Sequence, residues 1–140
     1  MWRKRITFAL IKLINMNAVH TEKAPAAIGP YSQAIDSGAG FVFVSGQLPI
    51  DPATGAFPQG GVAEQTRQSL TNAKAILAAA GLGLENVVKT TVFLADMGDF
   101  TAMNEVYAQF FSAPFPARSA VAVKTLPKGA LVAIECIAAK

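Results

Sequence analysis

Two apolar runs near the end of the chain each contain a single charged residue, and they constrain the fold most strongly. The run from Phe115 to Val123 holds Arg118, placed after a proline and before alternating valine and alanine. The run from Leu131 to Ala138 holds Glu135. Both runs are typical of β-strands, where a charged residue is seldom buried without a partner. Together they indicate a site. Taken alone, Arg118 also fits a surface arginine at the end of a strand.

The remaining segments predict one α+β domain. Strands are expected at residues 31–36, 41–47, 86–94, 115–123 and 130–138. A helix is expected over 62–80, because its apolar residues recur every three or four positions and Gly81 can end it. A second helix should follow Asp99, which can cap it, and carry a core stripe of Phe100, Met103, Tyr107, Phe110 and Phe111. We write the order as β-β-α-β-α-β, with both helices on one face of the sheet.

The composition indicates that the other face of the sheet is also covered. The chain is 52% hydrophobic and only 15% charged, whereas roughly 25% is usual for soluble domains. The last strands are apolar on both faces. We therefore expect self-association, although the number of copies does not follow from the sequence.

Positive charge is concentrated in a leader, residues 1–16, which has four basic residues and no acidic one. The other eight basic residues face nine acidic ones, a net charge of −1 that argues against nucleic acid as the main partner. The leader fits a membrane-surface segment, an organelle presequence, or translated sequence upstream of a start at Met16. We favour the last, with one domain over 17–140.

Few residues are suited to chemistry. The chain has one cysteine and one histidine, so neither a disulfide nor a zinc site is expected. Strand alternation puts Arg118 on one face with Ala120 and Ala122, whose small side chains leave room for a ligand. Glu135 and Cys136 point to opposite faces, and Cys136 is interpreted as a small buried hydrophobic residue. An arginine fork holds a carboxylate, and a carboxylate can exchange protons with water.

Five motifs occur in an order and spacing that resemble a known family. They are residues 26–33 (AAIGPYSQ), 45–47 (SGQ), 88–93 (VKTTVF), 116–119 (PARS) and 134–135 (IE). With these motifs, the chain from about Met16 to Lys140 resembles the reactive intermediate deaminase (Rid) family, and within it the imine-hydrolysing A branch.

The resemblance implies a chorismate-mutase-like fold assembled as a homotrimer, with three sites in the clefts between subunits. It implies hydrolysis of 2-iminobutanoate and 2-iminopropanoate, released by pyridoxal-phosphate-dependent dehydratases, without a metal or organic cofactor, in the cytoplasm. Carried over to this chain, Arg118 would hold the substrate carboxylate and Glu135 would position the attacking water. The pocket would be lined by Tyr31, Ser45, Gly46, Asn104 and Ala120.

One departure and two other functions remain open. Family members often have cysteine where this chain has Ala120, a position that is thought to act through its main chain, so activity is expected to survive. The same cleft could hold a 2-oxo acid without turnover, as a regulatory module. A ribonuclease role, sometimes attached to this family, is least favoured by the charge and by the single histidine.

Overall fold

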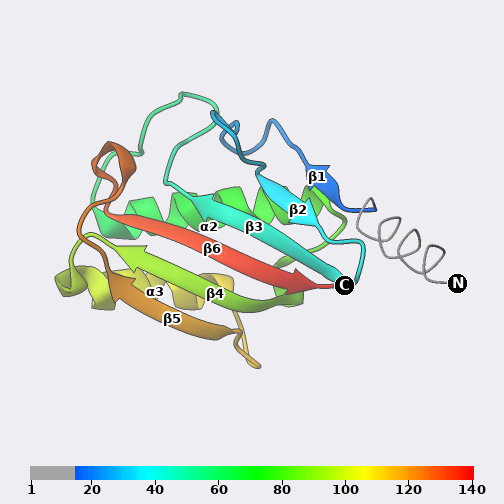
Figure 1. Ribbon diagram of the computed structural model, residues 1–140. Helices are drawn as coiled ribbons and strands as arrows, with labels where there is room; N and C mark the ends of the chain where they lie inside the picture. The colour runs from blue at the N-terminus through cyan, green and yellow to red at the C-terminus, as the bar shows by residue number, and fades with distance from the viewer. Residues whose placement is uncertain (1–14) are drawn as a thin grey trace, which may run out of the picture.

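The structure is a computed structural model that describes residues 15–140: a six-stranded sheet with two helices on one face (Figure 1). The prediction for the leader therefore lies outside the described residues, except for positions 15 and 16. In chain order the elements are β1 (Asn17–Val19), β2 (Ala34–Asp36), β3 (Phe41–Gln47), α2 (Val62–Ala79), β4 (Val87–Leu94), α3 (Phe100–Phe110), β5 (Ala117–Ala122) and β6 (Val132–Ala139). Three short 3-10 turns lie at Leu84–Asn86, Met97–Asp99 and Pro127–Gly129.

The strands lie in the order β1-β2-β3-β6-β4-β5, and this arrangement confirms the predicted α+β class. Among the strands of residues 15–140, only β4 and β5 are parallel, because α3 carries the chain back between them, and the other neighbours are antiparallel. The predicted order β-β-α-β-α-β omits two strands. One is β1, whose three residues are too few to show an alternating pattern, and the other is one of the two strands that follow α3.

The core lies between the sheet and the helices. α2 packs against β3 and β6 and also contacts α3, and Figure 1 shows both helices behind the sheet. The apolar face predicted for the first helix is buried, and Gly81 follows it with a left-handed φ of 77°. Asn72, buried on α2, donates hydrogen bonds to the carbonyls of Leu48 and Ile50 at 3.2 and 2.8 Å, and so fixes the loop after β3.

The predicted cap at Asp99 is wrong in its chemistry. Asp99 occupies the N-cap position of α3, but its side chain accepts no capping hydrogen bond. The 3-10 turn before α3 gives Asp99 a helical backbone, whereas a capping side chain reaches the first-turn amides from an extended one. Asp96 caps that turn instead, accepting a hydrogen bond from Gly98 N at 2.7 Å.

The face of the sheet away from the helices is apolar and open in the single chain. Phe41, Phe43 and Val121 are exposed by 44–46% of their surface, and the rings of Phe41 and Phe43 lie 6.5 Å apart. An exposed aromatic patch of this kind is typical of an interaction surface. Within residues 15–140, the structure contains no helix with the length and hydropathy needed to span a membrane.

Candidate active site

Arg118 lies on the helix-facing side of β5 and is held by three side chains of α3. It pairs in register with Thr90 of β4, and its Nη1 donates a 2.7 Å hydrogen bond to Asn104 Oδ1. Its guanidinium carbon lies 4.6 Å from the centre of the Tyr107 ring and 5.5 Å from that of Phe100. Aromatic faces attract a guanidinium and leave its in-plane donors free. Arg118 is therefore not a loose surface arginine.

These contacts form one wall of a pocket of about 420 Å³, lined by Asn104, Tyr107, Ala108, Phe115, Pro116 and Arg118. The structure thus brings together two predicted site residues, Asn104 and Arg118. Ala120, a third, follows Arg118 on the same face of β5 and is half-buried. This arrangement can bind a small anion in a bidentate way.

Sequence reasoning missed the contribution of Tyr107, which it assigned to the core. Tyr107 is indeed only 5% exposed, but its ring also contacts Arg118 and its hydroxyl lies 2.7 Å from the Thr90 hydroxyl. Two signals could have found it. Asn104 and Tyr107 lie one turn apart on the predicted helix, and Thr90 is a polar residue in a strand that is otherwise strongly apolar on its inner face.

Glu135 lies on the opposite face of the sheet from Arg118. Thr90 pairs with Arg118 on one side and with Cys136 on the other. Its neighbour Thr91 pairs with Glu135. Since consecutive strand residues point to opposite faces, the sheet itself separates the arginine from the carboxylate. A single chain therefore cannot present both groups to one small substrate.

On the open face of the sheet, polar side chains lie beside Glu135. Thr91 lies between Glu135 and Ser119 in a row across β6, β4 and β5. Lys89 Nζ donates a 3.3 Å hydrogen bond to Ser119 Oγ. Half-buried Glu135 thus lies among hydroxyl groups on an otherwise apolar surface.

The other predicted pocket residues gather beside the loop that follows β3. Tyr31 and Gly46 line a mostly apolar pocket of about 510 Å³, to which β6 contributes Ala133. Ser45 Oγ donates a 2.6 Å hydrogen bond to Ser32 O, and its lone pairs stay available to accept one. Ala133 lies two residues before Glu135 and so on the same face of β6. The predicted site therefore consists of two separate groups in one chain.

Cys136 is buried on the helix side, as predicted. Burial, and then the nearby Glu135 charge, raise the pKa of the Cys136 thiol to about 12. The thiolate is the nucleophilic form. Cys136 is therefore protonated near neutral pH and unsuited to covalent catalysis.

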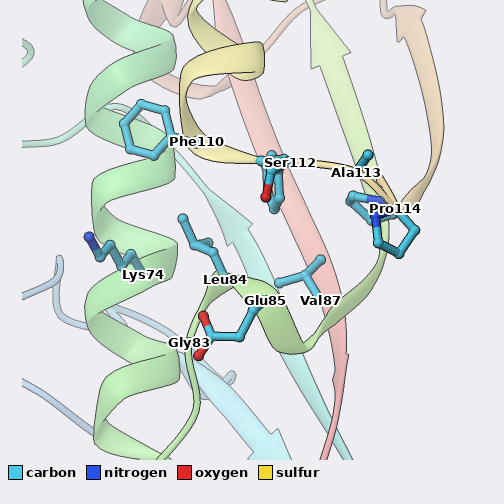
Figure 2. Close-up of a pocket in the computed structure, with 11 residues that line it drawn as sticks. Lys74, Gly83, Leu84, Glu85, Val87, Phe110, Ser112, Ala113 and Pro114 are labelled. Atoms are coloured by element: carbon cyan, nitrogen blue, oxygen red, sulfur yellow. The ribbon is translucent and has the colours of Figure 1, made fainter.

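A further pocket of about 390 Å³ lies between α2, the end of α3 and the turn at Leu84–Asn86 (Figure 2). It shares Pro116 with the Arg118 pocket and contains none of the predicted site residues. Its charged groups, Lys74 and Glu85, are exposed to solvent, which weakens their electrostatic effect. In the described part of the chain, no three His, Cys, Asp or Glu side chains converge as metal ligands would.

Comparison with known proteins places these features in context. The family described as endoribonuclease L-PSP matches residues 21–140. A RutC family protein of Pyrococcus horikoshii is 57% identical over 122 residues, 87% of this chain and 96% of that protein. The 2-iminobutanoate/2-iminopropanoate deaminase of Bos taurus is 55% identical over 120 residues, 86% of this chain and 87% of that protein. A crystal structure of E. coli TdcF with bound serine superimposes with a TM-score of 0.84 at 47% identity, covering 89% of this chain and 98% of that one.

Proposed function

This chain belongs to the endoribonuclease L-PSP family, as the Rid resemblance of its sequence predicted, and on that premise we propose that it hydrolyses small 2-imino acids to 2-oxo acids and ammonia. The observation that carries the proposal is the state of Arg118. Asn104 occupies one guanidinium nitrogen and Tyr107 covers one face, which leaves a fork of donors at a pocket for a carboxylate.

The chemistry requires little of the protein, because an imine is already electrophilic. Arg118 binds the carboxylate, and water adds to the imine carbon while Glu135 accepts a proton from it. That proton passes to the imine nitrogen and gives an amino alcohol. The hydroxyl proton of this intermediate then also moves to the nitrogen as the C–O bond becomes double and the C–N bond breaks, so a 2-oxo acid and ammonia leave. Orientation of the two reactants supplies most of the acceleration.

The separation of Arg118 and Glu135 supports a site shared between copies. We propose that one copy supplies Asn104, Arg118 and Ala120, and that its neighbour supplies Glu135 with Tyr31, Ser45 and Gly46. The exposed aromatic patch on the open face supports such a contact. A homotrimer built from the domain at residues 17–140, with the leader as a separate segment, is the assembly we propose.

The proposed substrates are 2-iminobutanoate and 2-iminopropanoate, which pyridoxal-phosphate-dependent dehydratases release. One relative is named for these two compounds, and one solved relative holds serine. Serine has a carboxylate and a nitrogen on the same carbon atom, as the imino acids do. Both names support a small ligand of this class.

The description endoribonuclease suggests RNA cleavage, which this chain supports poorly. Outside the leader its net charge is −1, too little to attract a phosphate backbone. Its single histidine, His20, is exposed and has no second histidine to share acid–base work.

A competition assay tests the activity. Threonine dehydratase supplies the imine, semicarbazide traps it, and active protein suppresses semicarbazone formation. Arg118→Ala should abolish the suppression, whereas Arg67→Ala, an exposed arginine on α2 outside the Arg118 pocket, should retain it. Equal suppression by wild type and Arg118→Ala would show the proposal to be wrong.

A second function is favoured by one observation: Glu135 lies on the far side of the sheet from Arg118. If the copies do not bring them together, the Arg118 pocket binds a 2-oxo acid without turnover and acts as a regulatory module. Tight binding of 2-oxobutanoate without any catalysed loss of imine would support this alternative.

A further inference from the structure

We propose that Tyr107 and Thr90 are positioning residues that hold the Arg118 guanidinium in its carboxylate-binding orientation. The proposal rests on the proposed function, since it assumes that Arg118 binds the substrate carboxylate. Neither residue belongs to the site predicted from the sequence. Each acts through a contact in the interior, where packing and hydrogen bonding leave few alternative arrangements.

The first contact fixes the ring of Tyr107. Its hydroxyl lies 2.7 Å from that of Thr90, and Thr90 is fully buried on β4. The ring also packs against Phe111, with the two ring centres 4.6 Å apart. A tyrosine that is held at its hydroxyl and along its ring keeps one orientation. Tyr107 therefore offers Arg118 a fixed aromatic face.

The second contact transfers this order to the guanidinium. The Arg118 guanidinium carbon lies 4.6 Å from the Tyr107 ring centre, and the Asn104 bond fixes the rotation of the guanidinium plane. A free arginine loses much rotamer freedom when it binds a ligand. Arg118 has already lost this freedom before the ligand arrives. The guanidinium donors that Asn104 leaves free are therefore correctly oriented when the carboxylate binds.

The chemistry of the pair fits this role. Burial raises the pKa of Tyr107, so the ring beside the guanidinium is a neutral phenol and not a competing anion. Thr90 pairs in register with Arg118 itself. One β4 residue is thus the strand neighbour of the arginine and also the anchor of the ring that supports it. A tyrosine that only filled the core would need a partner for its hydroxyl, but it would not need the contact with the guanidinium.

Three variants separate the contacts. Tyr107→Phe and Thr90→Val each remove the hydroxyl pair and keep the ring, whereas Tyr107→Leu removes the ring. Phe110→Leu is the matched control, because Phe110 is a half-buried aromatic residue of α3 that does not line the Arg118 pocket. The readouts are the calorimetric Kd for 2-oxobutanoate, kcat and KM for the imine, and the NMR shift of the Arg118 Nε proton.

Tyr107→Leu should weaken 2-oxobutanoate binding about tenfold, the loss expected for a partly desolvated cation–π contact, and raise KM by a similar factor. Its Arg118 Nε proton should lose the ring-current shift, which Phe110→Leu preserves. Tyr107→Phe and Thr90→Val should retain part of the shift and weaken binding by a few-fold. If Tyr107→Leu does not fold, Tyr107→Phe, Thr90→Val and the ring-current shift in wild type still test the positioning role.

An Arg118 Nε proton without a ring-current shift in wild type would overturn the proposal, and so would wild-type affinity in Tyr107→Leu. The function is tested separately by Arg118→Ala. If that variant binds 2-oxobutanoate normally, the proposed site is wrong, whereas the NMR shift still reports the contact between Tyr107 and Arg118. Normal binding by Tyr107→Leu beside loss in Arg118→Ala would reject the positioning role alone.

Discussion

Two inactive variants should restore activity when they are mixed, because each chain supplies only half of the proposed site. Arg118 and Glu135 lie on opposite faces of one sheet and are paired in register with the adjacent residues Thr90 and Thr91. Arg118→Ala removes the guanidinium that binds the substrate carboxylate, and Glu135→Gln removes the group that accepts a proton from water. Neither variant is expected to turn over imine alone.

The recovered activity can be calculated from the geometry. In a cyclic assembly with one repeated interface, each site takes Arg118 from one copy and Glu135 from its neighbour. In an equal, random mixture, a site is intact only when both copies that form it supply an unchanged group. The copy that supplies Arg118 must then be Glu135→Gln, and the copy that supplies Glu135 must be Arg118→Ala. Each condition holds about half of the time, so about one quarter of the sites regain both groups. This fraction does not depend on the number of copies in the ring.

The assay refolds the two variants together from denaturant, verifies mixed assemblies by native mass spectrometry, and measures suppression of semicarbazone formation. A mixture of Arg118→Ala with Asn104→Ala is the matched control. Both changes lie in the same half of the site, so every site lacks one group and no activity should be gained. Verified mixed assemblies of Arg118→Ala and Glu135→Gln that remain as inactive as the separate variants would refute the shared site.

Three further predictions concern stability. The pKa of Cys136 is raised to about 12 from 9.0, so above pH 9 the folded state keeps a proton that the unfolded state loses. The free energy of unfolding should therefore fall above pH 9 by about 1.4 kcal/mol per pH unit. Urea titrations of Cys136→Ala should lack this contribution. Asn72→Ala should cost about 2 kcal/mol by the same method, because the carbonyls of Leu48 and Ile50 lose their donor, and it should also raise KM, because both residues line the Tyr31 pocket. Thr66→Val should raise the melting temperature, gaining about 1 kcal/mol, because the buried Thr66 hydroxyl has no hydrogen-bond partner among residues 15–140; a lower melting temperature would contradict this.

Local periodicity in the sequence made most of the fold predictable. It predicted the strand β3 at Phe41–Gln47 to the residue, the buried face of α2, and the opposite directions of Glu135 and Cys136. Each of these depends on a local period of two or about 3.6 residues, which a sequence displays directly. No repeating sequence pattern of this kind indicates the strand β1 or the helical backbone conformation of Asp99. They depend on pairing with β2 and on a preceding turn, so local pattern alone could not predict them.

Candidate site residues could be predicted from the sequence, but their arrangement in space could not. Arg118 and Glu135 were selected as candidates because a charge in an apolar strand is unusual. Tyr107 was not, because an aromatic residue on a helix stripe fits the core equally well, and only its contact with Arg118 distinguishes it. A sequence shows what each face of an element carries, but which faces meet depends on how the elements pack.

The apolar open face and the divided site have a common physical reason. The aromatic rings of Tyr107 and Phe100, on the helix side of the sheet, hold Arg118 in its orientation. Alternation then forces Glu135 onto the other face, which no helix of the described chain covers. A neighbouring copy that covers Phe41, Phe43 and Val121 would exclude bulk water from that surface and leave room for a single reacting water. In the proposed assembly, the contact that buries the aromatic patch is therefore the same contact that completes the site, and a separated chain would lose catalysis while keeping its fold.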